Sequence, residues 1–372
     1  MGKPPSVVVA LSGGVDSSLA AALLKEQGWL VKGVHFLLPA TPERREERKR
    51  SVCRIGESLG IGISFLDLEA EFVRFVQEPF VGAYFRGFTP NPCVICNHLI
   101  KFDHLVQHAD AQGFDYIATG HYARIRKSEE NLNQLLRGQD KAKEQSYFLH
   151  RLNQTHLSKT VFPLENLTKR ESRVLARERH LPSSEEPESQ EICFVPGNDY
   201  RAFVESRREP SLRKKGDILN SQGHKVGEHQ GVYRYTIGQR HGLGIASPSP
   251  YYIKAIDPLK DLIVVGRKEE LFSTDVEAEA FHWIEEQPQK GGQELLAQVR
   301  YRHEAAIGQL EIHAPDHVRF RFHEPQWAIT PGQALVLYAG DRVLGGGWIT
   351  RSAQPVSRCS FSGMVIKDRE TR

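Results

Sequence analysis

Val7-Val8-Val9-Ala10-Leu11-Ser12-Gly13-Gly14-Val15-Asp16-Ser17-Ser18 runs from a predicted strand through a glycine loop into a predicted helix. The valines are typical of a buried strand, and the alanine- and leucine-rich run after Ser18 is a strong helix former with an apolar face. Two adjacent glycines let the backbone approach a ligand closely, and a helix start offers unpaired N–H groups and the positive end of a dipole. The sequence therefore predicts an anion site between this strand and this helix.

This loop is not the ordinary phosphate loop, because no lysine follows its glycines. Asp16 follows them instead, which favours a pyrophosphate group whose charge is shared with Mg²⁺ held by the carboxylate. The loop resembles the pyrophosphate loop of the ATP pyrophosphatase superfamily, whose members split ATP into AMP and pyrophosphate to activate a carbonyl oxygen. The alternative is a tight strand-to-helix turn that binds no ligand.

The composition is that of an ordinary globular protein, with 372 residues, 40% hydrophobic and 26% charged, and a formal net charge of +3. A chain of this length can form two or three domains, and a polyanionic partner must be met by local basic patches. No apolar run approaches the roughly 18 residues of a membrane span, so we expect a cytoplasmic protein with no membrane partner. Five irregularly spaced cysteines argue against a structural disulfide framework.

Strand and helix patterns alternate after the glycine loop. Residues 28–39 and 61–68 are predicted strands, and residues 41–58 between them form a charged helical stretch. This alternation predicts a parallel sheet with helices on both faces, in which ligands bind at the carboxyl ends of the strands. Gly13 and Phe36 both fall there, and Phe36 is either a wall for adenine or a core aromatic.

A Cys-Xaa2-Cys pair follows a predicted helix at residues 71–86. Pro90 and Pro92 predict that Cys93 and Cys96 lie on a restrained loop before a helix at 99–111, where a helix N-terminus favours the thiolate. The pair alone fits a redox couple, half of a zinc site or part of an iron–sulfur site. Because no second pair at zinc spacing follows, a closed structural zinc site is not expected.

Three further segments contain candidate functional residues. Residues 114–123 predict a strand whose exit loop holds Gly120, which can approach a nucleotide, and His121, which is a ligand-positioning or a surface residue. Residues 136–149 mix cations, amides and aromatics, which suits phosphate and base contacts or a solvated turn. The acidic loop 182–190 leads to the lone Cys193, which suggests a mobile nucleophile.

The second half of the chain is rich in glycine, aromatics, cations and two-residue alternation. Residues 227–244 suit a small β-rich module with an RNA-facing surface, and the alternating runs after residue 274 predict a small β-barrel. We therefore expect an ATP-binding catalytic domain at 1–205, a β-rich domain at 206–273, a β-barrel at 274–352 and a partly ordered tail at 353–372. That the domain at 206–273 contacts tRNA is implied by the family resemblance described next.

Nine motifs in a fixed order resemble those of the tRNA-specific 2-thiouridylases. The resemblance covers residues 6–350 and implies a Rossmann-like N-terminal domain of the HUP, adenine nucleotide alpha hydrolase-like type. It also implies a β-rich central domain and a C-terminal β-barrel. The motifs are residues 12–17, 91–97, 120–122, 144–149, 192–194, 227–231, 236–240, 330–333 and 344–347.

The resemblance implies a tRNA uridine 2-sulfurtransferase. ATP, with Mg²⁺, would adenylate the C2 carbonyl oxygen of the wobble uridine in tRNA, and a cysteine persulfide would then deliver sulfur to give 2-thiouridine, AMP and pyrophosphate. A persulfide-carrying protein or a cysteine desulfurase would supply the sulfur. By the same resemblance Cys193 carries the persulfide, and Cys96 is the partner thiol that releases sulfide or a disulfide-linked product.

The family's other site residues carry over position by position, and the target uridine is expected to flip out of its stack. Asn91, Pro92 and Cys93 should border the target base. Expected ATP contacts are Ala10, Leu11, Ser12, Gly13, Gly14, Val15, Asp16, Ser17, Phe36 and Gly120. Expected tRNA contacts are His121, Lys143, Glu144, Gln145, Arg300, Tyr301 and Gln333.

Two positions depart from the family pattern. Cys93 stands where many members have aspartate, and Phe36 stands where methionine is frequent. The first departure leaves open a [4Fe–4S]-dependent thiolase in which Cys93, Cys96 and Cys193 ligate the cluster. Another enzyme of the ATP pyrophosphatase superfamily, or an RNA-binding protein without activity, are the remaining alternatives. The tRNA isoacceptors, the sulfur donor and the oligomeric state are not encoded in these motifs.

Overall fold

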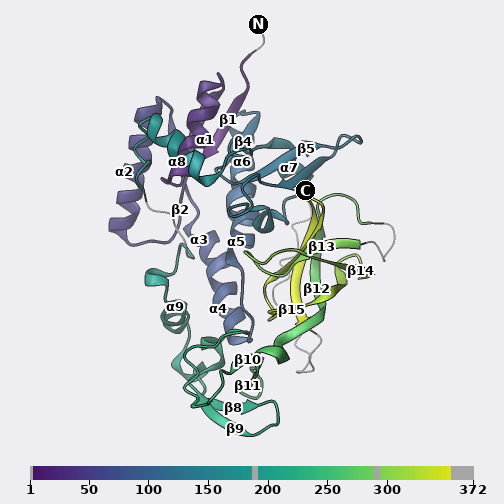
Figure 1. The fold of residues 1–372 in the computed structure, drawn as a ribbon. Helices are drawn as coiled ribbons and strands as arrows, with labels where there is room; N and C mark the ends of the chain where they lie inside the picture. The colour runs from purple at the N-terminus through teal and green to yellow at the C-terminus, as the bar shows by residue number, and fades with distance from the viewer. Residues whose placement is uncertain (1–2, 187–191, 289–293, 353–372) are drawn as a thin grey trace.

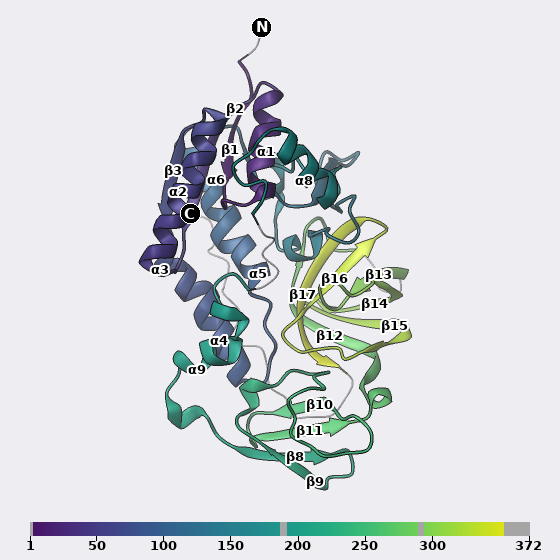
Figure 2. The same cartoon turned by 60° about the vertical axis from the view of Figure 1, so that its left-hand side comes forward.

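The computed structural model describes residues 3–186, 192–288 and 294–352, and its three parts follow one another along the chain (Figure 1). Residues 187–190 of the expected acidic loop and the whole expected tail at 353–372 lie outside these ranges. The N-terminal part lies at one end of the molecule, and the small sheet of the central part lies at the other end. The C-terminal barrel packs beside both (Figure 2). No helix in the described ranges is both long and apolar enough to cross a bilayer.

A five-stranded parallel sheet forms the N-terminal part, which confirms the predicted Rossmann-like class. Its strand order is β3-β2-β1-β4-β7. Val7 and Val9 pack toward α1 and α2, whereas Val8 packs toward α6 on the opposite face, so helices cover both sides. The elements are β1 Ser6–Ala10, α1 Val15–Glu26, β2 Leu30–Leu37, α2 Pro42–Leu59, β3 Ile63–Asp67, β4 Tyr116–Ala118, β7 Thr160–Val161 and α8 Lys169–Glu178.

Two long helical segments connect this sheet to the rest of the molecule. Each contains a π-helical stretch, η1 in the first and η2 in the second. The first carries Phe80 and Tyr84, which pack against Phe203 and Tyr233 of the next part of the chain. The segments are α3 Glu69–Phe72, η1 Val73–Gln77 and α4 Glu78–Phe85, then α5 Pro92–Ile95, η2 Cys96–Phe102 and α6 Asp103–Ala111.

The second segment corrects a prediction. The two prolines do not keep Cys93 and Cys96 in a loop, because the helix begins at Pro92 and continues to Ala111. Proline is compatible with the first helical turn, where its missing N–H would have had no partner. Both cysteines of the pair therefore lie on a helix.

The central part is a small mixed sheet with the order β10-β11-β8-β9. Its core is built from Ile218, Ile253, Ile263 and Val265, all of which are fully buried. Its elements are α9 Tyr200–Ser206, β8 Gly216–Asn220, β9 Lys225–His229, β10 Tyr252–Asp257 and β11 Leu262–Gly266, with short helical turns η4 Pro196–Asn198, η5 Pro210–Leu212 and η6 Val232–Arg234.

The C-terminal part is a closed antiparallel barrel of six strands, as the two-residue alternation predicts. Pairing of β12 with β17 closes it, and Val318, Phe320 and Phe322 of β15 alternate into its interior. The strands are β12 Phe272–Trp283, β13 Glu294–Gln298, β14 Ala306–Ala314, β15 His317–Trp327, β16 Ala334–Ala339 and β17 Arg342–Ser352, preceded by η7 Lys268–Leu271.

A hairpin from the N-terminal part extends the barrel's sheet, which the sequence did not predict. Leu136 pairs with Arg342 of β17. Ala334, Val336 and Trp348 of the barrel also join the core cluster that contains Val8. The barrel thus packs directly against the N-terminal part. The hairpin is β5 Ala123–Lys127 and β6 Asn133–Arg137, and η3 Ser146–Leu149 and α7 Gln154–Lys159 follow it.

Candidate active site

The glycine loop lies between β1 and α1, as predicted. The backbone N–H of Ser12 donates to Ser17 Oγ at 3.1 Å, and Ser17 Oγ donates in turn to the Gly14 carbonyl at 3.1 Å. Gly13 has φ +91°, a conformation that L side chains rarely adopt. No side chain of the described residues caps the start of α1, so its first N–H groups are available to an anion.

Gly120 packs against the start of α1. A Cβ atom at this position would lie 2.7 Å from the Asp16 carbonyl carbon and 2.8 Å from the Ser17 nitrogen. Glycine is therefore required here for the close approach of two backbones. The predicted ATP contact of Gly120 remains a prediction, and its packing role is an additional finding.

Asp16 has partners that the sequence did not reveal. Lys169 Nζ donates to both of its carboxylate oxygens, at 2.7 and 2.6 Å, and Tyr122 Oη donates to Oδ1 at 2.8 Å. Lys169 is the first residue of α8, and its backbone N–H donates to Asp140 Oδ2 at 2.8 Å. A Thr-Xaa2-Glu capping box at Thr168 and Glu171 could have predicted this helix start, but not its target.

Phe36 lies in β2 and is half-buried. It packs against the core cluster of the parallel sheet and also against the cluster that contains Cys96. Its side chain thus links the strand end beside the glycine loop to the cysteine region. This placement is compatible with both interpretations, a core aromatic and a wall for adenine.

Cys96 and Cys193, which are far apart in the sequence, lie in the same region. Cys96 is buried at 6% exposure, and Cys193 is exposed. Phe194, next to Cys193, packs on Phe72 with ring centroids 5.4 Å apart, and both rings belong to the cluster around Cys96. Cys193 is also close enough to raise the pKa values of Cys93 and Cys96. The four cysteines in the described ranges are all free.

The protonation of the pair contradicts the expectation from the helix N-terminus. Burial raises the pKa of the Cys96 thiol to about 12, and the protein packed around Cys93 raises its pKa to about 11, although part of that side chain reaches solvent. Desolvation therefore outweighs the helix dipole. The ammonium of Lys101 opposes this effect at both thiols.

Lys101 is a second residue that the sequence analysis missed. Its Nζ donates to Asn97 Oδ1 at 2.8 Å, and Asn97 Nδ2 donates to the Phe148 carbonyl at 3.2 Å. Lys101 follows Asn97 by one helical turn, so the helix itself sets this spacing. The contact orients a cation beside the cysteine pair.

The segment before the cysteine pair is held by all three parts of the molecule. The backbone N–H of Thr89 donates to the Pro331 carbonyl at 2.9 Å, and Gln333 Nε2 donates to the Thr89 carbonyl at 2.9 Å. Thr89 Oγ1 donates to Thr236 Oγ1 of the central part at 3.3 Å. Asn91, predicted to border the target base, is 9% exposed and hydrogen-bonds Tyr147.

Several predicted tRNA contacts have partners within the protein. Gln145 Oε1 accepts from the Tyr122 N–H at 3.1 Å, and Glu144, 8% exposed, accepts from the Ser146 N–H at 3.0 Å. Arg300 Nη1 donates to the Trp327 carbonyl at 3.0 Å. These bonds hold the three side chains against other parts of the protein. Their contact with tRNA remains a prediction.

Three other members of that set are placed as follows. Tyr301 packs on Phe148 with ring centroids 4.4 Å apart, and Lys143 is half-buried. His121 Nδ1 is 2.8 Å from Thr119 Oγ1, and burial lowers the pKa of His121 well below its usual value. An imidazole that stays neutral contributes no charge toward a phosphate, so a contact from His121 would be a hydrogen bond or packing.

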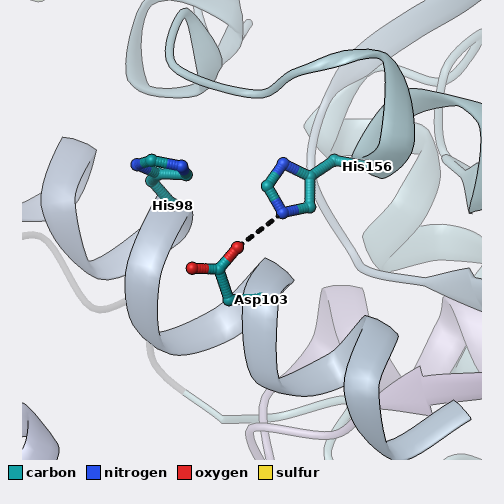
Figure 3. A group of neighbouring side chains, drawn as sticks. All are labelled: His98, Asp103 and His156. Carbon is teal, nitrogen blue, oxygen red and sulfur yellow. Dashed lines mark hydrogen bonds and ion pairs between the residues drawn. The ribbon is translucent and has the colours of Figure 1, made fainter. Parts of the chain in front are cut away.

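One group in the described ranges has metal-ligand geometry: His98, Asp103 and His156 (Figure 3). His156 Nε2 donates to Asp103 Oδ1 at 2.7 Å, because its Nδ1 already accepts the Asn153 N–H at 3.3 Å. Burial lowers the pKa of His98 to about 4. The hydrogen bonds satisfy His156 without an ion, so the group is explained as a link between α6 and α7.

Family models match three successive parts of the chain. The model described as the tRNA methyl transferase HUP domain matches residues 5–197. The tRNA methyl transferase PRC-barrel domain model matches residues 201–267, and the aminomethyltransferase beta-barrel domain model matches residues 273–349.

Curated relatives match nearly the whole chain. A tRNA-specific 2-thiouridylase MnmA from Geobacter metallireducens is 44% identical and covers 92% of this chain and 96% of its own length. The protein of the same name from Syntrophotalea carbinolica is 43% identical over 93% and 99%. A solved 4-thiouridine synthetase–RNA complex with bound ATP is 17% identical over 54% of this chain and 50% of that chain, with a TM-score of 0.35, too low to carry an argument.

Proposed function

Because the chain belongs to the family of tRNA-specific 2-thiouridylases, we propose that it is a tRNA uridine 2-sulfurtransferase that uses ATP. The observation that carries this proposal is the convergence of Cys96 and Cys193 on one region. A synthetase that only adenylates its substrate needs no such pair. In this proposal residues 1–205 form the catalytic domain, 206–273 contact tRNA and 274–352 form the barrel domain.

The first step is adenylation. The C2 carbonyl oxygen of the wobble uridine attacks the α-phosphorus of ATP, and pyrophosphate leaves. The uncapped N-terminus of α1 and the glycine loop supply N–H donors for the phosphates. Asp16 is the residue suited to hold Mg²⁺, which would neutralise charge on the leaving pyrophosphate.

The second step is sulfur transfer. The terminal sulfur of a Cys193 persulfide attacks C2 and forms a C2–S bond, and AMP leaves with the former carbonyl oxygen. The Cys96 thiol then attacks the Cys193 sulfur and gives up its proton as it does so. The persulfide bond breaks, the thiocarbonyl stays on the base, and the proton ends on the ring nitrogen that lost one during adenylation. The step leaves a Cys96–Cys193 disulfide on the protein. An external thiol must reduce this disulfide before the next cycle.

The sulfur donor in this proposal is a persulfide-carrying protein or a cysteine desulfurase. The exposed position of Cys193 supports transfer from such a protein, because the acceptor thiol must be reached from outside. The flipped uridine would lie near Asn91, Pro92 and Cys93. We place the reaction in the cytoplasm.

The proposal is tested by mass spectrometry of tRNA after incubation with ATP, Mg²⁺ and a persulfide source. Wild-type protein should give 2-thiouridine and one pyrophosphate for each thiolated base. A 2-thiouridine signal without ATP consumption would contradict the adenylation step. Pyrophosphate release without any thiolation would favour a different enzyme of the superfamily.

The [4Fe–4S] variant of this function has its own test. Cys193 is close enough to raise the pKa values of Cys93 and Cys96, and Cys93 also raises that of Cys96. Three thiols are therefore present in one region. Iron and acid-labile sulfide analysis of anaerobically purified protein separates the two mechanisms. Protein that is free of iron and fully active would eliminate the cluster.

A further inference from the structure

Cys93 is the third thiol of the cysteine region, and it takes no part in the adenylation step or the sulfur-transfer step. It lies in the short helix α5, and Cys96 begins the π-helical stretch that continues the same helix. Residues three apart lie on one face of a helix, with Cα atoms about 5 Å apart. A disulfide needs Cα atoms about 4.4–6.8 Å apart. The helix therefore holds Cys93 within reach of the Cys96 sulfur.

The three cysteines differ in their access to solvent. Cys93 and Cys193 are exposed. Cys96 is 6% exposed and packs with Phe72 and Ile100. Water solvates a thiolate that forms on an exposed sulfur, whereas a thiolate on a buried sulfur loses this solvation. A Cys96–Cys193 disulfide is therefore cleaved more easily when Cys193 is the sulfur that leaves.

Cys193 leaves when a thiol attacks the Cys96 sulfur, which is the buried end of the disulfide. A thiol from solution reaches the exposed end first, whereas Cys93 reaches the buried end from within its own helix. The charges of Cys93 and Cys193 both raise the pKa of Cys96, which agrees with three thiols in one region. The Lys101 ammonium lowers the pKa of Cys93 against the effect of burial, so it favours the attacking thiolate.

We propose that Cys93 is a resolving thiol, which takes the place of Cys193 in the disulfide and frees Cys193 for the next sulfur atom. The inference rests on the proposed function, because it needs the Cys96–Cys193 disulfide that sulfur transfer leaves. The Cys93 sulfur forms a bond to the Cys96 sulfur, and the Cys96–Cys193 bond breaks. The proton of Cys93 ends on the Cys193 sulfur. This exchange involves no net oxidation, and the external thiol then reduces the Cys93–Cys96 disulfide.

The identity of the disulfide separates this role from that of a residue that only borders the target base. A resolving Cys93 ends one turnover joined to Cys96. A Cys93 that only borders the base stays a free thiol, and the Cys96–Cys193 disulfide persists. Trypsin makes the two products distinct, because Cys93 and Cys96 lie on one peptide, residues 87–101, and Cys193 lies on another, residues 180–201.

The experiment follows a single turnover of the full chain. The protein is treated with polysulfide to form the persulfide, freed of excess reagent, and mixed with ATP, Mg²⁺ and tRNA without a reductant. Samples are quenched in acid at increasing times, alkylated with N-ethylmaleimide, digested with trypsin and analysed by mass spectrometry. In wild type the cross-linked peptides should form first. They should then fall at least tenfold below a peptide 87–101 that has lost two hydrogens, as alkylated Cys193 appears.

Cys93→Ser should keep the cross-linked peptides, because it has no thiol to replace Cys193. Cys53→Ser is the matched control, since Cys53 lies on α2 and should leave the order of disulfides as in wild type. Cross-linked peptides that persist in wild type after 2-thiouridine has formed, with Cys93 alkylated, would overturn the resolving role and leave the proposed function intact. Wild-type protein that forms neither 2-thiouridine nor a disulfide would overturn both.

Discussion

The glycine loop and the cysteine region differ in how the chain builds them. The loop is one contiguous segment, and its main bonds join Ser12, Gly14 and Ser17 within six residues. The cysteine region is assembled from the α5–η2 helix, the segment around Cys193, and a barrel turn that holds Thr89. The first is a local structure, and the second depends on the packing of the whole molecule.

This difference decides which chemical properties can be inferred from the sequence. The predicted anion-binding character of the loop rests on local backbone geometry, which glycines and a helix start determine. The reactivity of Cys96 follows from burial by residues such as Phe72 and Ile100, and burial is a tertiary property. A substitution in the loop should therefore weaken ligand binding there and leave the cysteine chemistry unchanged, and a substitution in the cysteine region should do the reverse.

Substitution of the cysteines themselves should give the largest difference between the effect on thiolation and the effect on pyrophosphate binding. Cys96→Ser and Cys193→Ser should each lower 2-thiouridine formation by at least about a thousandfold, because each removes a sulfur that forms or breaks a bond. Pyrophosphate binding should stay within about twofold of wild type, since the hydrogen bonds that shape the loop join Ser12, Gly14 and Ser17 and involve neither cysteine. The measurements are mass spectrometry of tRNA and calorimetry.

Cys53→Ser is the control for these variants, because Cys53 lies on α2 and takes no part in the proposed chemistry. It should thiolate tRNA as wild type does. A 2-thiouridine signal that survives both Cys96→Ser and Cys193→Ser would contradict sulfur transfer through this pair.

The sequence was sufficient for the fold class and for the loop, but not for the residues that complete each region. Periodicity predicts the parallel sheet and the barrel because strands bury alternate or continuous apolar residues. Lys169 and Lys101 were missed because their targets are set by tertiary packing. The prediction of a favoured thiolate was wrong because it counted the helix dipole and not the burial of Cys96.

A glycine beside each region gives the next comparison. Gly120→Ala adds a Cβ atom 2.7 Å from the Asp16 backbone, and such overpacking costs about 1–3 kcal/mol. ATP affinity should fall roughly tenfold, the equivalent of about 1.4 kcal/mol, while thiol alkylation of Cys96 stays unchanged. Gly62→Ala is the control, since a Cβ atom there meets nothing within 4 Å. Equal ATP affinities in the two variants would contradict the packing role of Gly120.

The corresponding change near the cysteines is Gly332→Ala in the barrel turn. Its Cβ atom would lie 2.9 Å from the Thr89 carbonyl oxygen and 3.0 Å from Phe88 Cβ. We expect thiolation to fall several-fold with ATP affinity unchanged, because the turn holds the segment that leads to Asn91 and Cys93. The measurement is single-turnover thiolation with ATP in excess.

Gly340→Ala separates this contact from backbone strain. Gly340 also has a positive φ, +60° against +92° for Gly332, but a Cβ atom there meets nothing within 4 Å. Both variants lose roughly 1 kcal/mol of stability from the left-handed conformation. Only Gly332→Ala should lose thiolation beyond that. Equal losses would show that the barrel turn does not position the cysteine helix.

The smallest expected effect concerns the charge beside Cys96. Since burial raises the pKa of this thiol to about 12, the thiolate fraction, and with it alkylation by a small reagent, should rise about tenfold per pH unit between pH 7 and 10. Lys101→Gln should lower alkylation a few-fold at each pH, because the ammonium favours the thiolate. Fragment-ion mass spectrometry distinguishes Cys96 from Cys93.

The same raised pKa has a consequence for stability with a definite sign. The unfolded chain releases the Cys96 proton near its ordinary pKa of about 8.5, whereas the folded chain keeps it until about pH 12. Stability from this group is therefore complete below about pH 8.5 and falls as the pH rises toward 12. Urea unfolding at pH 8 and pH 10 should show a smaller loss for Cys96→Ser than for wild type. An equal loss of unfolding free energy in both proteins would mean that burial does not raise the pKa of Cys96. The tertiary packing around the cysteines would then not control their protonation.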